Sequence, residues 1–298
     1  MKDRRQRSIS PALKNLLIFL STIFICAIVF TIVTIIIFKN EFFDRSQTSS
    51  VVFVDKRPPE NENILLVQKR NGSDTDAERF WLIGLDFSKK NITVSALFPE
   101  TLTFSGGRSD TLKGQFAYAG INHAVAAVEG LFDIKIARYA VLSKSDLVSI
   151  IDWHGGIVFT PDKRVSYTDP DTGVTVTLEP ERQNLKGGQV LALLDYENND
   201  AVERISIEQN LLEAFFNQYV NETYLNYAEK NYLFMIELMD TNLSYANIRD
   251  WLPHLYEIAK ADKPCTALSV AGEYKYIDLR NVFIVSDECI ERFGKEYD

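Results

Sequence analysis

Acidic and basic side chains crowd together shortly before the second predicted strand of this chain. Asp74, Asp76 and Glu78 supply three carboxylates at alternate positions, and Arg79 follows directly. Clustered carboxylate oxygens at the mouth of a strand can hold Mg²⁺, often with a phosphate completing the coordination shell. Taken alone, the stretch also fits a solvated acidic loop. Arg79 and the later Arg108 add positive charge that an anionic ligand would need.

A second polar group lies on a predicted helix further along the chain. Arg204 has a guanidinium that can bind two phosphate oxygens at once. Glu208 and Gln209 follow it on the same helix. The alternative is a surface arginine that pairs with Asp200 or Glu208. We therefore treat Arg204 as a candidate phosphate-binding residue.

Other common site types are absent from the sequence. There is no Walker loop, no dinucleotide fingerprint and no nucleophile elbow. With three histidines and no Cys-x-x-Cys pair, the chain has no zinc-site pattern. Cys26 lies in an apolar segment, whereas Cys265 and Cys289 either form a disulfide or stay as two buried thiols.

The charge distribution separates the start of the chain from the rest. The whole chain carries −9, residues 1–15 carry +4, and residues 39–298 carry −13. Nucleic-acid backbones are bound by clustered Lys and Arg, so this acidity argues against nucleic acid as a partner. It does not exclude a small anionic ligand, because a local charge can oppose the net charge.

The elements that must position these residues alternate between strands and helices. Short apolar runs predict strands, and apolar residues at helical spacing predict helices, one of them capped by Ser143 and one by Ser244. The predicted strands are 64–67, 80–87, 91–98, 138–142, 157–159, 266–270 and 281–285, with a hairpin of 164–168 and 174–178. The predicted helices are 117–132, 144–153, 189–196, 201–227, 245–260 and a short terminal one. This order indicates an α/β fold with a mixed sheet sandwiched by helices.

The first part of the chain predicts a membrane anchor. Residues 16–38 contain no charged side chain, and a helix of this length can cross a bilayer core of roughly 30 Å. The alternative is a cleaved signal peptide, but its apolar core is usually shorter, about 7–15 residues. The basic segment 1–15 predicts a cytoplasmic tail by the positive-inside rule. We expect 39–60 to form a polar stalk and 61–298 to form an extracytoplasmic domain.

Several motifs, in this order and spacing, resemble the LytR-CpsA-Psr family of cell-envelope proteins. The resemblance spans about residues 61–298 and includes the anchor topology. The matching motifs are NILLV (63–67), FPET (98–101), INHA (121–124), IIDWHGGI (150–157), LKGGQVLAL (185–193) and DTNLS (240–244). Each motif is weak alone, whereas their order predicts the fold of this family.

The resemblance implies an activity outside the cytoplasmic membrane. Family members are Mg²⁺-dependent phosphotransferases that take a glycopolymer from a polyprenyl pyrophosphate carrier and join it to peptidoglycan. Arginines bind the pyrophosphate, carboxylates hold Mg²⁺, and the lipid tail lies in an apolar tunnel between sheet and helices. A leaving pyrophosphate needs its charge neutralised and little covalent chemistry from the protein.

This chain departs from the family pattern at the positions that carry the chemistry. Alignment on residues 80–82 puts Asp76 at a family arginine and Glu78 at the metal-binding aspartate. Glu100 takes the place of a pyrophosphate-binding arginine, and Glu-Asn-Asn at 197–199 replaces an Arg-x-Arg pair. In the final cluster Arg204 and Gln209 match, but Glu208 replaces the second arginine. Each such exchange removes an ionic hydrogen bond of roughly 1.5–3 kcal/mol and adds repulsion.

Three functional hypotheses follow. The first is a membrane-anchored protein that binds a polyprenyl-linked glycopolymer precursor with weak or no transferase activity. The second is an active Mg²⁺-dependent phosphotransferase acting on peptidoglycan, with Asp74, Asp76 or Glu78 on the metal and Arg79, Arg108 or Arg204 on the phosphates. The third is a structural or sensory domain without a ligand, its tunnel filled by aromatic side chains.

Overall fold

The computed structural model describes residues 60–298, apart from 171 and 197–199. The predicted tail 1–15, the predicted membrane helix 16–38 and the stalk up to residue 59 lie outside the described residues. Within the described part of the chain, no helix is long and apolar enough to cross a membrane.

A mixed sheet of six strands forms the centre of the domain, in the order β11-β6-β1-β2-β3-β12. β1 pairs antiparallel with β2 and parallel with β6, and β3 pairs antiparallel with β2 and parallel with β12. The short β11 pairs antiparallel with β6. The strands are β1 (Glu62–Lys69), β2 (Ala77–Asp86), β3 (Asn91–Leu97), β6 (Arg138–Ser143), β11 (Asp240–Thr241) and β12 (Cys265–Ala267). This confirms the predicted α/β fold with a mixed sheet.

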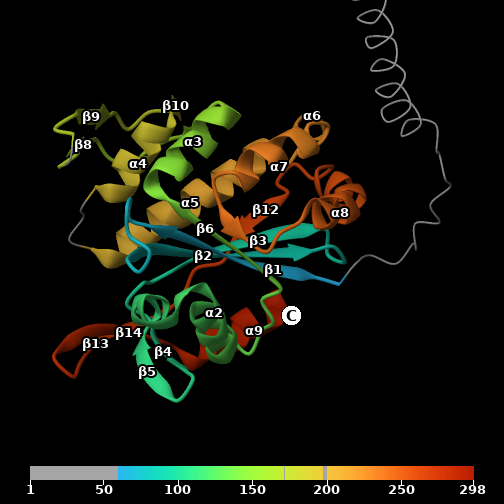
Figure 1. Ribbon diagram of the computed structural model, residues 1–298. Helices are drawn as coiled ribbons and strands as arrows, with labels where there is room; N and C mark the ends of the chain where they lie inside the picture. Colours follow the sequence, from blue (N-terminus) through green and yellow to red (C-terminus); the bar gives the residue numbers. More distant parts are fainter. Residues whose placement is uncertain (1–59, 171, 197–199) are drawn as a thin grey trace, which may run out of the picture. The chain divides into compact units, whose positions relative to one another are not determined.

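Helices cover both faces of this sheet (Figure 1). One face carries α3 (Lys144–His154), α4 (Gly187–Asp195), α5 (Ala201–Tyr219), α6 (Glu222–Leu225), α7 (Ala228–Ile236) and α8 (Tyr245–Ile258). The other carries α2 (Leu112–Phe132) and α9 (Asp287–Tyr297). Two hairpins lie on the side of α2, namely β4 (Leu102–Ser105) with β5 (Arg108–Thr111), and β13 (Gly272–Ile277) with β14 (Arg280–Val285). Near α3 and α4, β7 (Ile157–Phe159) pairs with β10 (Gln183–Leu185), and β8 (Val165–Thr168) with β9 (Thr175–Leu178).

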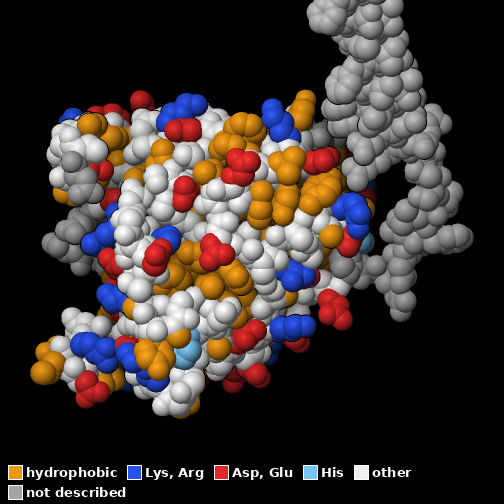
Figure 2. Space-filling model, in the orientation of Figure 1, with side chains coloured by type: hydrophobic (Ala, Val, Ile, Leu, Met, Phe, Trp, Pro, Cys, Tyr) orange, Lys and Arg blue, Asp and Glu red, His pale blue; other side chains and the backbone are white. Residues whose placement is uncertain are grey.

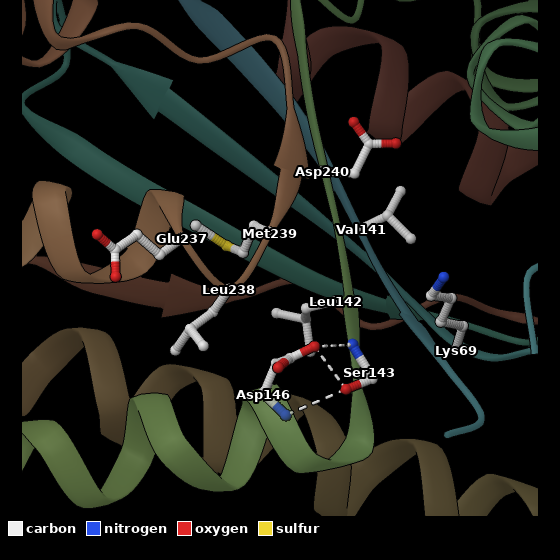
Figure 3. Close-up of a pocket in the computed structure, with 9 residues that line it drawn as sticks. All are labelled: Lys69, Val141, Leu142, Ser143, Asp146, Glu237, Leu238, Met239 and Asp240. Carbon is white, nitrogen blue, oxygen red and sulfur yellow. Dashed lines mark hydrogen bonds between the residues drawn. The ribbon is translucent and has the colours of Figure 1, made fainter. Parts of the chain in front are cut away.

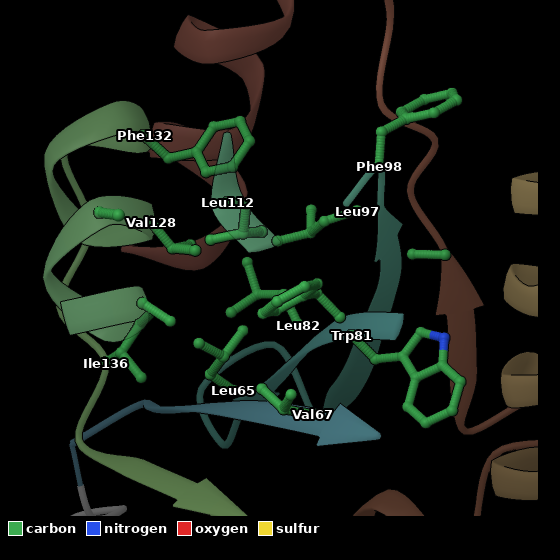
Figure 4. Packing of buried hydrophobic residues seen from close by; sticks show 14 of the residues in the cluster. Leu65, Val67, Trp81, Leu82, Leu97, Phe98, Leu112, Val128, Phe132 and Ile136 are labelled. Atoms are coloured by element: carbon green, nitrogen blue, oxygen red, sulfur yellow. The ribbon is translucent and has the colours of Figure 1, made fainter. Parts of the chain in front are cut away.

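Burial along β2 explains why it occupies the middle of the sheet. All its residues except Glu78 are buried, as expected for a strand covered on both faces. Leu82 packs in a cluster with Phe132 of α2 (Figure 4), and the ring of Phe80 contacts that of Phe116 on the same helix. Ile83 belongs to another cluster, formed with residues of α8. The strand thus contributes side chains to two cores.

Some predicted boundaries differ from those in the structure, and capping side chains give the reason. The predicted helix 201–227 is wrong, because α5 ends at Tyr219 and Asn221 caps the separate α6 by accepting from the Tyr224 amide at 3.2 Å. α2 starts at Leu112, earlier than predicted, because Thr111 caps it. The strand β13 and the hairpin β4–β5 were not predicted, whereas the β8–β9 hairpin is confirmed.

The two cysteines of the domain are both buried free thiols. The disulfide alternative is therefore wrong for Cys265 and Cys289 in this structure. Burial raises the pKa of Cys265, which keeps it protonated at neutral pH.

Candidate ligand-binding site

Four strand ends meet at one edge of the sheet. Lys69 at the end of β1 is the partner of Ala77 at the start of β2 and of Ser143 at the end of β6. Leu97 at the end of β3 lies opposite Phe80. The residues that follow these strand ends therefore converge, at the carboxyl ends of β1, β3 and β6. Ligands of open α/β sheets commonly bind at such an edge.

A buried group that we call the inner cluster lies at this edge and consists of Glu78, Arg79, Lys144, Asp195 and Glu208. The Arg79 guanidinium is buried and donates to Asp195 Oδ1 at 2.6 Å. It also donates to the Leu194 carbonyl at 3.0 Å and to the amide oxygen of Gln68. Both terminal nitrogens of this guanidinium are thus engaged by the protein itself, whereas its buried Nε makes no hydrogen bond among the described residues.

Lys144 occupies the space between two carboxylates of the inner cluster. Its Nζ lies 3.0 Å from Glu78 Oε2 and 3.0 Å from Asp195 Oδ2. Arg79 contacts the same two carboxylates, with Nη1 3.6 Å from Glu78 Oε2. Two positive charges therefore neutralise the two carboxylates. Burial alone would raise the pKa of Glu78, but hydrogen bonds from Arg70, Lys144 and Gln68 together hold it below the ordinary value.

Glu208 is the most deeply buried carboxylate of the inner cluster, with 3% of its surface exposed. Trp81 Nε1 donates to Glu208 Oε2 at 3.1 Å, and Arg79 Nε lies 3.4 Å from Oε1. Burial, only partly offset by Arg79 and Arg204, raises the pKa of Glu208 to about 7. At this pKa the carboxyl of Glu208 is close to half protonated at neutral pH.

A second set of residues, the outer group, lies at the same edge and consists of Glu100, Lys113, Arg204, Gln209 and Tyr274. Arg204 Nη2 is 3.4 Å from Glu100 Oε2, and Lys113 Nζ is 3.8 Å from Glu100 Oε1. The Tyr274 hydroxyl donates to Glu100 Oε2 at 3.4 Å. Two cations and a hydroxyl thus surround one carboxylate in the way they would surround an anionic ligand group.

Gln209 adds an open acceptor to the outer group. Its amide nitrogen donates to Ser269 Oγ at 3.0 Å. Its Oε1 is buried and has no partner among the described residues. A buried polar atom without a partner costs about 1–3 kcal/mol, so a donor on a ligand would be favoured there. Burial, helped by the Glu100 carboxylate, raises the pKa of the neighbouring Tyr274 to about 12, which keeps its hydroxyl a donor.

Each of the three carboxylates predicted to hold Mg²⁺ pairs with a basic side chain of the protein. Asp74 has 94% of its side chain exposed and pairs with Lys69 at 2.6 Å. Asp76 pairs with Arg70 at 3.2 Å, and Arg70 also reaches Glu78 at 3.0 Å. In the described part of the chain, no group of three or more His, Cys, Asp or Glu could hold a metal ion.

The donor set at the sheet edge does not fit a divalent cation. Mg²⁺ needs several free oxygen ligands in near-octahedral arrangement. The carboxylates of Glu78 and Asp195, which face each other across Lys144, already bind Lys144 and Arg79. Their negative charge is neutralised by the protein itself, and a metal ion would have to displace an ammonium.

Arg108, the remaining predicted ligand-binding residue, lies away from both groups. It begins β5, pairs with Asp110 and lies over the Tyr118 ring at 4.6 Å from the ring centroid. Burial alone would raise the pKa of Asp110. Its bonds to Arg108 and Arg280 outweigh burial and hold the pKa below its ordinary value. Among the predicted site residues, the structure brings Glu78, Arg79, Arg204 and Gln209 to one edge and leaves Arg108 outside.

A pocket of about 310 Å³ opens where β6 and the chain before β11 diverge (Figure 3). Three of its polar side chains, those of Lys69, Ser143 and Asp146, already have partners within the protein. Asp146 accepts from the Ser143 amide at 3.0 Å, and Lys69 pairs with Asp74. The pocket is lined by Lys69, Val141, Leu142, Ser143, Asp146, Glu237, Leu238, Met239 and Asp240. We therefore do not assign the candidate site to this pocket.

Sequence reasoning missed Lys144, Asp195 and Lys113. Lys144 directly follows the predicted strand 138–142 and its capping Ser143, so its place at a strand end was a usable signal. Asp195 ends α4 and offers no such signal, because its partner Arg79 lies 116 residues earlier.

Comparisons with known proteins agree with this fold. The LytR_cpsA_psr family model matches residues 44–297. Biofilm regulatory protein A of Streptococcus mutans is 26% identical over 157 residues, which cover 47% of this chain and 38% of that protein. The chain therefore spans well under half of that relative.

Several solved structures are similar to this fold. Bacillus subtilis TagV has a TM-score of 0.69 and 16% identity, over 80% of this chain and 95% of that one. A putative transcription regulator from Eubacterium siraeum has a TM-score of 0.69 and 16% identity, over 79% and 90%. TagT bound to LI-WTA has a TM-score of 0.63 and 15% identity, over 80% and 89%. At these identities the similarity shows the fold alone.

Proposed function

Because the chain belongs to the LytR_cpsA_psr family, we propose that it takes part in cell-envelope glycopolymer assembly by binding a polyprenyl-(pyro)phosphate-linked precursor. Its transferase activity toward peptidoglycan is weak or absent. In this proposal residues 16–38 anchor the protein in the cytoplasmic membrane, the tail 1–15 is cytoplasmic, and the domain 61–298 is extracytoplasmic. The structure of TagT bound to LI-WTA, on the same fold, supports a ligand of this class.

The outer group supplies the binding residues in this proposal. Arg204 is one-third exposed and Lys113 is half exposed, so both can turn toward a phosphate. The free Gln209 oxygen accepts a hydrogen bond from the ligand, and the Tyr274 hydroxyl donates one.

One observation supports weak or absent catalysis above all others. Lys144 and Arg79 neutralise Glu78 and Asp195 from within the protein. Phosphoryl transfer depends on cations that stabilise charge developing on the phosphates. Here Arg79 is turned to the chain's own carboxylates, and no step of our proposal passes through Mg²⁺.

The test is binding of geranylgeranyl pyrophosphate to the full chain in nanodiscs, measured by native mass spectrometry with Mg²⁺ or EDTA. We expect similar binding in both, no conversion to the monophosphate, and roughly tenfold weaker binding for Arg204→Met, since one ionic hydrogen bond of about 1.5 kcal/mol is lost. Arg249→Met is the matched control, because Arg249 is exposed and pairs with Asp250 on α8.

Two results would contradict this proposal. Equal binding by the wild type and Arg204→Met removes Arg204 from the site. Mg²⁺-dependent release of the monophosphate, absent with EDTA, identifies an active phosphotransferase instead.

A further inference from the structure

The hairpin of β13 and β14 exposes apolar side chains at its tip. Every residue of β13 is exposed. Tyr276 has 69% of its surface exposed and Leu279 has 85%, and Ile277 lies between them in sequence. Figure 1 shows the hairpin extending from the side of the sheet that α2 covers. These side chains therefore add nothing to the cores of the domain.

The turn of this hairpin also has an unfavourable backbone. Asp278 and Leu279 connect the strands with φ of 49° and 64°. Two-residue hairpin turns of this kind favour Asn and Gly, and a leucine with positive φ is uncommon. Leu279 thus has a strained backbone conformation and an apolar side chain that is exposed to solvent. Strain of this kind is often found at functional positions.

Two more exposed aromatic residues continue this surface. Phe104 on β4 and Tyr118 on α2 are both well exposed, and we call Phe104, Tyr118, Tyr276, Ile277 and Leu279 the hairpin surface. Figure 2 shows hydrophobic and basic side chains next to each other in the region of the hairpin and α2.

Ion pairs connect the parts of the hairpin surface. Arg280, opposite Ile277, lies 2.8 Å from Asp110 Oδ1. The same carboxylate pairs with Arg108, which in turn lies over the Tyr118 ring. One carboxylate thus serves two guanidiniums. With Glu273, Lys275 and Asp278 of the same hairpin, the positive and negative charges of this surface balance, whereas residues 39–298 as a whole carry −13.

We propose that the hairpin surface docks on the phospholipid surface of the membrane that carries the anchor, with Tyr276, Ile277 and Leu279 entering the headgroup region. Aromatic and branched apolar residues beside Arg favour this interface, where apolar bodies are buried and charged heads meet anionic lipid. A domain that carries −13 is repelled least by an anionic membrane at a surface without net charge, such as the hairpin surface.

The length of the stalk permits this contact. The proposal rests on the anchor at 16–38 proposed above. A chain of the length of residues 39–59 spans at most about 70–75 Å when extended. That exceeds the diameter of roughly 45 Å for a compact domain of this size, so any face of the domain can reach the membrane.

The first experiment measures quenching of tryptophan fluorescence by brominated lipids. Tyr276→Trp and Tyr227→Trp are compared in the full chain in nanodiscs, after subtraction of the wild-type signal. Tyr227 is a matched control, since it is 59% exposed and lies next to α7 on the opposite face of the sheet. We expect at least threefold stronger quenching at position 276. Equal quenching, or stronger quenching at 227, overturns the proposal.

The second experiment separates this surface from the anchor. Residues Arg57–Asp298 form a compact unit that contains the three apolar clusters. We expect this unit to float with vesicles containing one-third phosphatidylglycerol, and the double variant Tyr276→Glu, Leu279→Glu to bind at least fivefold more weakly. Leu233→Glu, at an exposed site on α7, is the control.

The results of these experiments distinguish the membrane from a second copy of the chain as the partner of the hairpin surface. If the unit does not bind vesicles but dimerises, and the double variant is monomeric, the hairpin surface binds a second copy and the proposal is wrong. If the full chain does not copurify with nanodiscs, the anchor proposal fails. Vesicle binding by the unit Arg57–Asp298 then decides whether the hairpin surface binds a membrane.

Discussion

The inner cluster and the outer group lie at the same sheet edge, yet their charges are used in opposite ways. In the inner cluster, Arg79 and Lys144 are held by Glu78 and Asp195 in positions largely closed to water. In the outer group, Arg204 and Lys113 share the carboxylate of Glu100 and remain partly exposed. Buried charges need their partners to avoid desolvation costs, whereas exposed charges can exchange partners. The inner cluster is therefore structural, and the outer group is available to a ligand.

The largest expected effect is a difference in stability between variants of the inner cluster and variants of the outer group. Arg79→Met leaves Glu208 without the buried cation beside it and Asp195 with Lys144 alone, and it should lower the free energy of unfolding by about 3–5 kcal/mol. Arg204→Met removes a partly exposed pair and should cost less than about 1 kcal/mol. Urea denaturation of both variants measures this difference. Equal losses would mean that the inner cluster is not more structural than the outer group.

The second effect is a pH dependence confined to the inner cluster. The pKa of Glu208 is about 7 in the folded protein and about 4.5 when it is exposed. The folded state thus binds this proton more tightly, so the contribution of Glu208 to stability is largest below pH 4.5 and is lost as the pH rises to 7. Relative to Glu208→Gln, wild-type stability should fall by about 3 kcal/mol across this window.

Urea unfolding of both proteins between pH 5 and 8 tests this expectation. Parallel stability curves for the wild type and Glu208→Gln would show that Glu208 is ionised throughout. Glu78 serves as an internal contrast, since its lowered pKa adds stability that is lost only as the pH falls through that pKa.

The smallest expected effect sharpens the role of the outer group. Glu100→Gln removes the negative charge that Arg204 and Lys113 now share, so both become more available to a phosphate. Affinity for inorganic pyrophosphate should rise about fivefold, corresponding to about 1 kcal/mol. Isothermal titration calorimetry measures this. Glu257→Gln is the control, because Glu257 is an exposed residue of α8 that pairs with Lys90 and Lys260. An unchanged or lower affinity would mean that Glu100 does not compete with the ligand.

Local sequence was sufficient to predict most elements of the fold. The apolar run of β1, the capping Ser143 before α3 and the turn residues between β8 and β9 all act within a few residues. Predictions failed where a boundary depended on one side chain, as with Asn221 between α5 and α6. The hairpin surface escaped prediction because its turn, Asp278–Leu279, is not one that hairpins favour.

The sequence by itself determined the apolar segment 16–38, the acidity of residues 39–298 and the mixed α/β fold. Only the tertiary structure decided how the remaining charges pair. Arg204, a candidate phosphate-binding residue whose alternative partners from the sequence were Asp200 and Glu208, pairs with Glu100, 104 residues earlier. Arg79 meets Asp195 across 116 residues. Secondary structure follows from neighbours along the chain, whereas the pairing of charges depends on which strand ends and helices the folded sheet brings within a few ångströms.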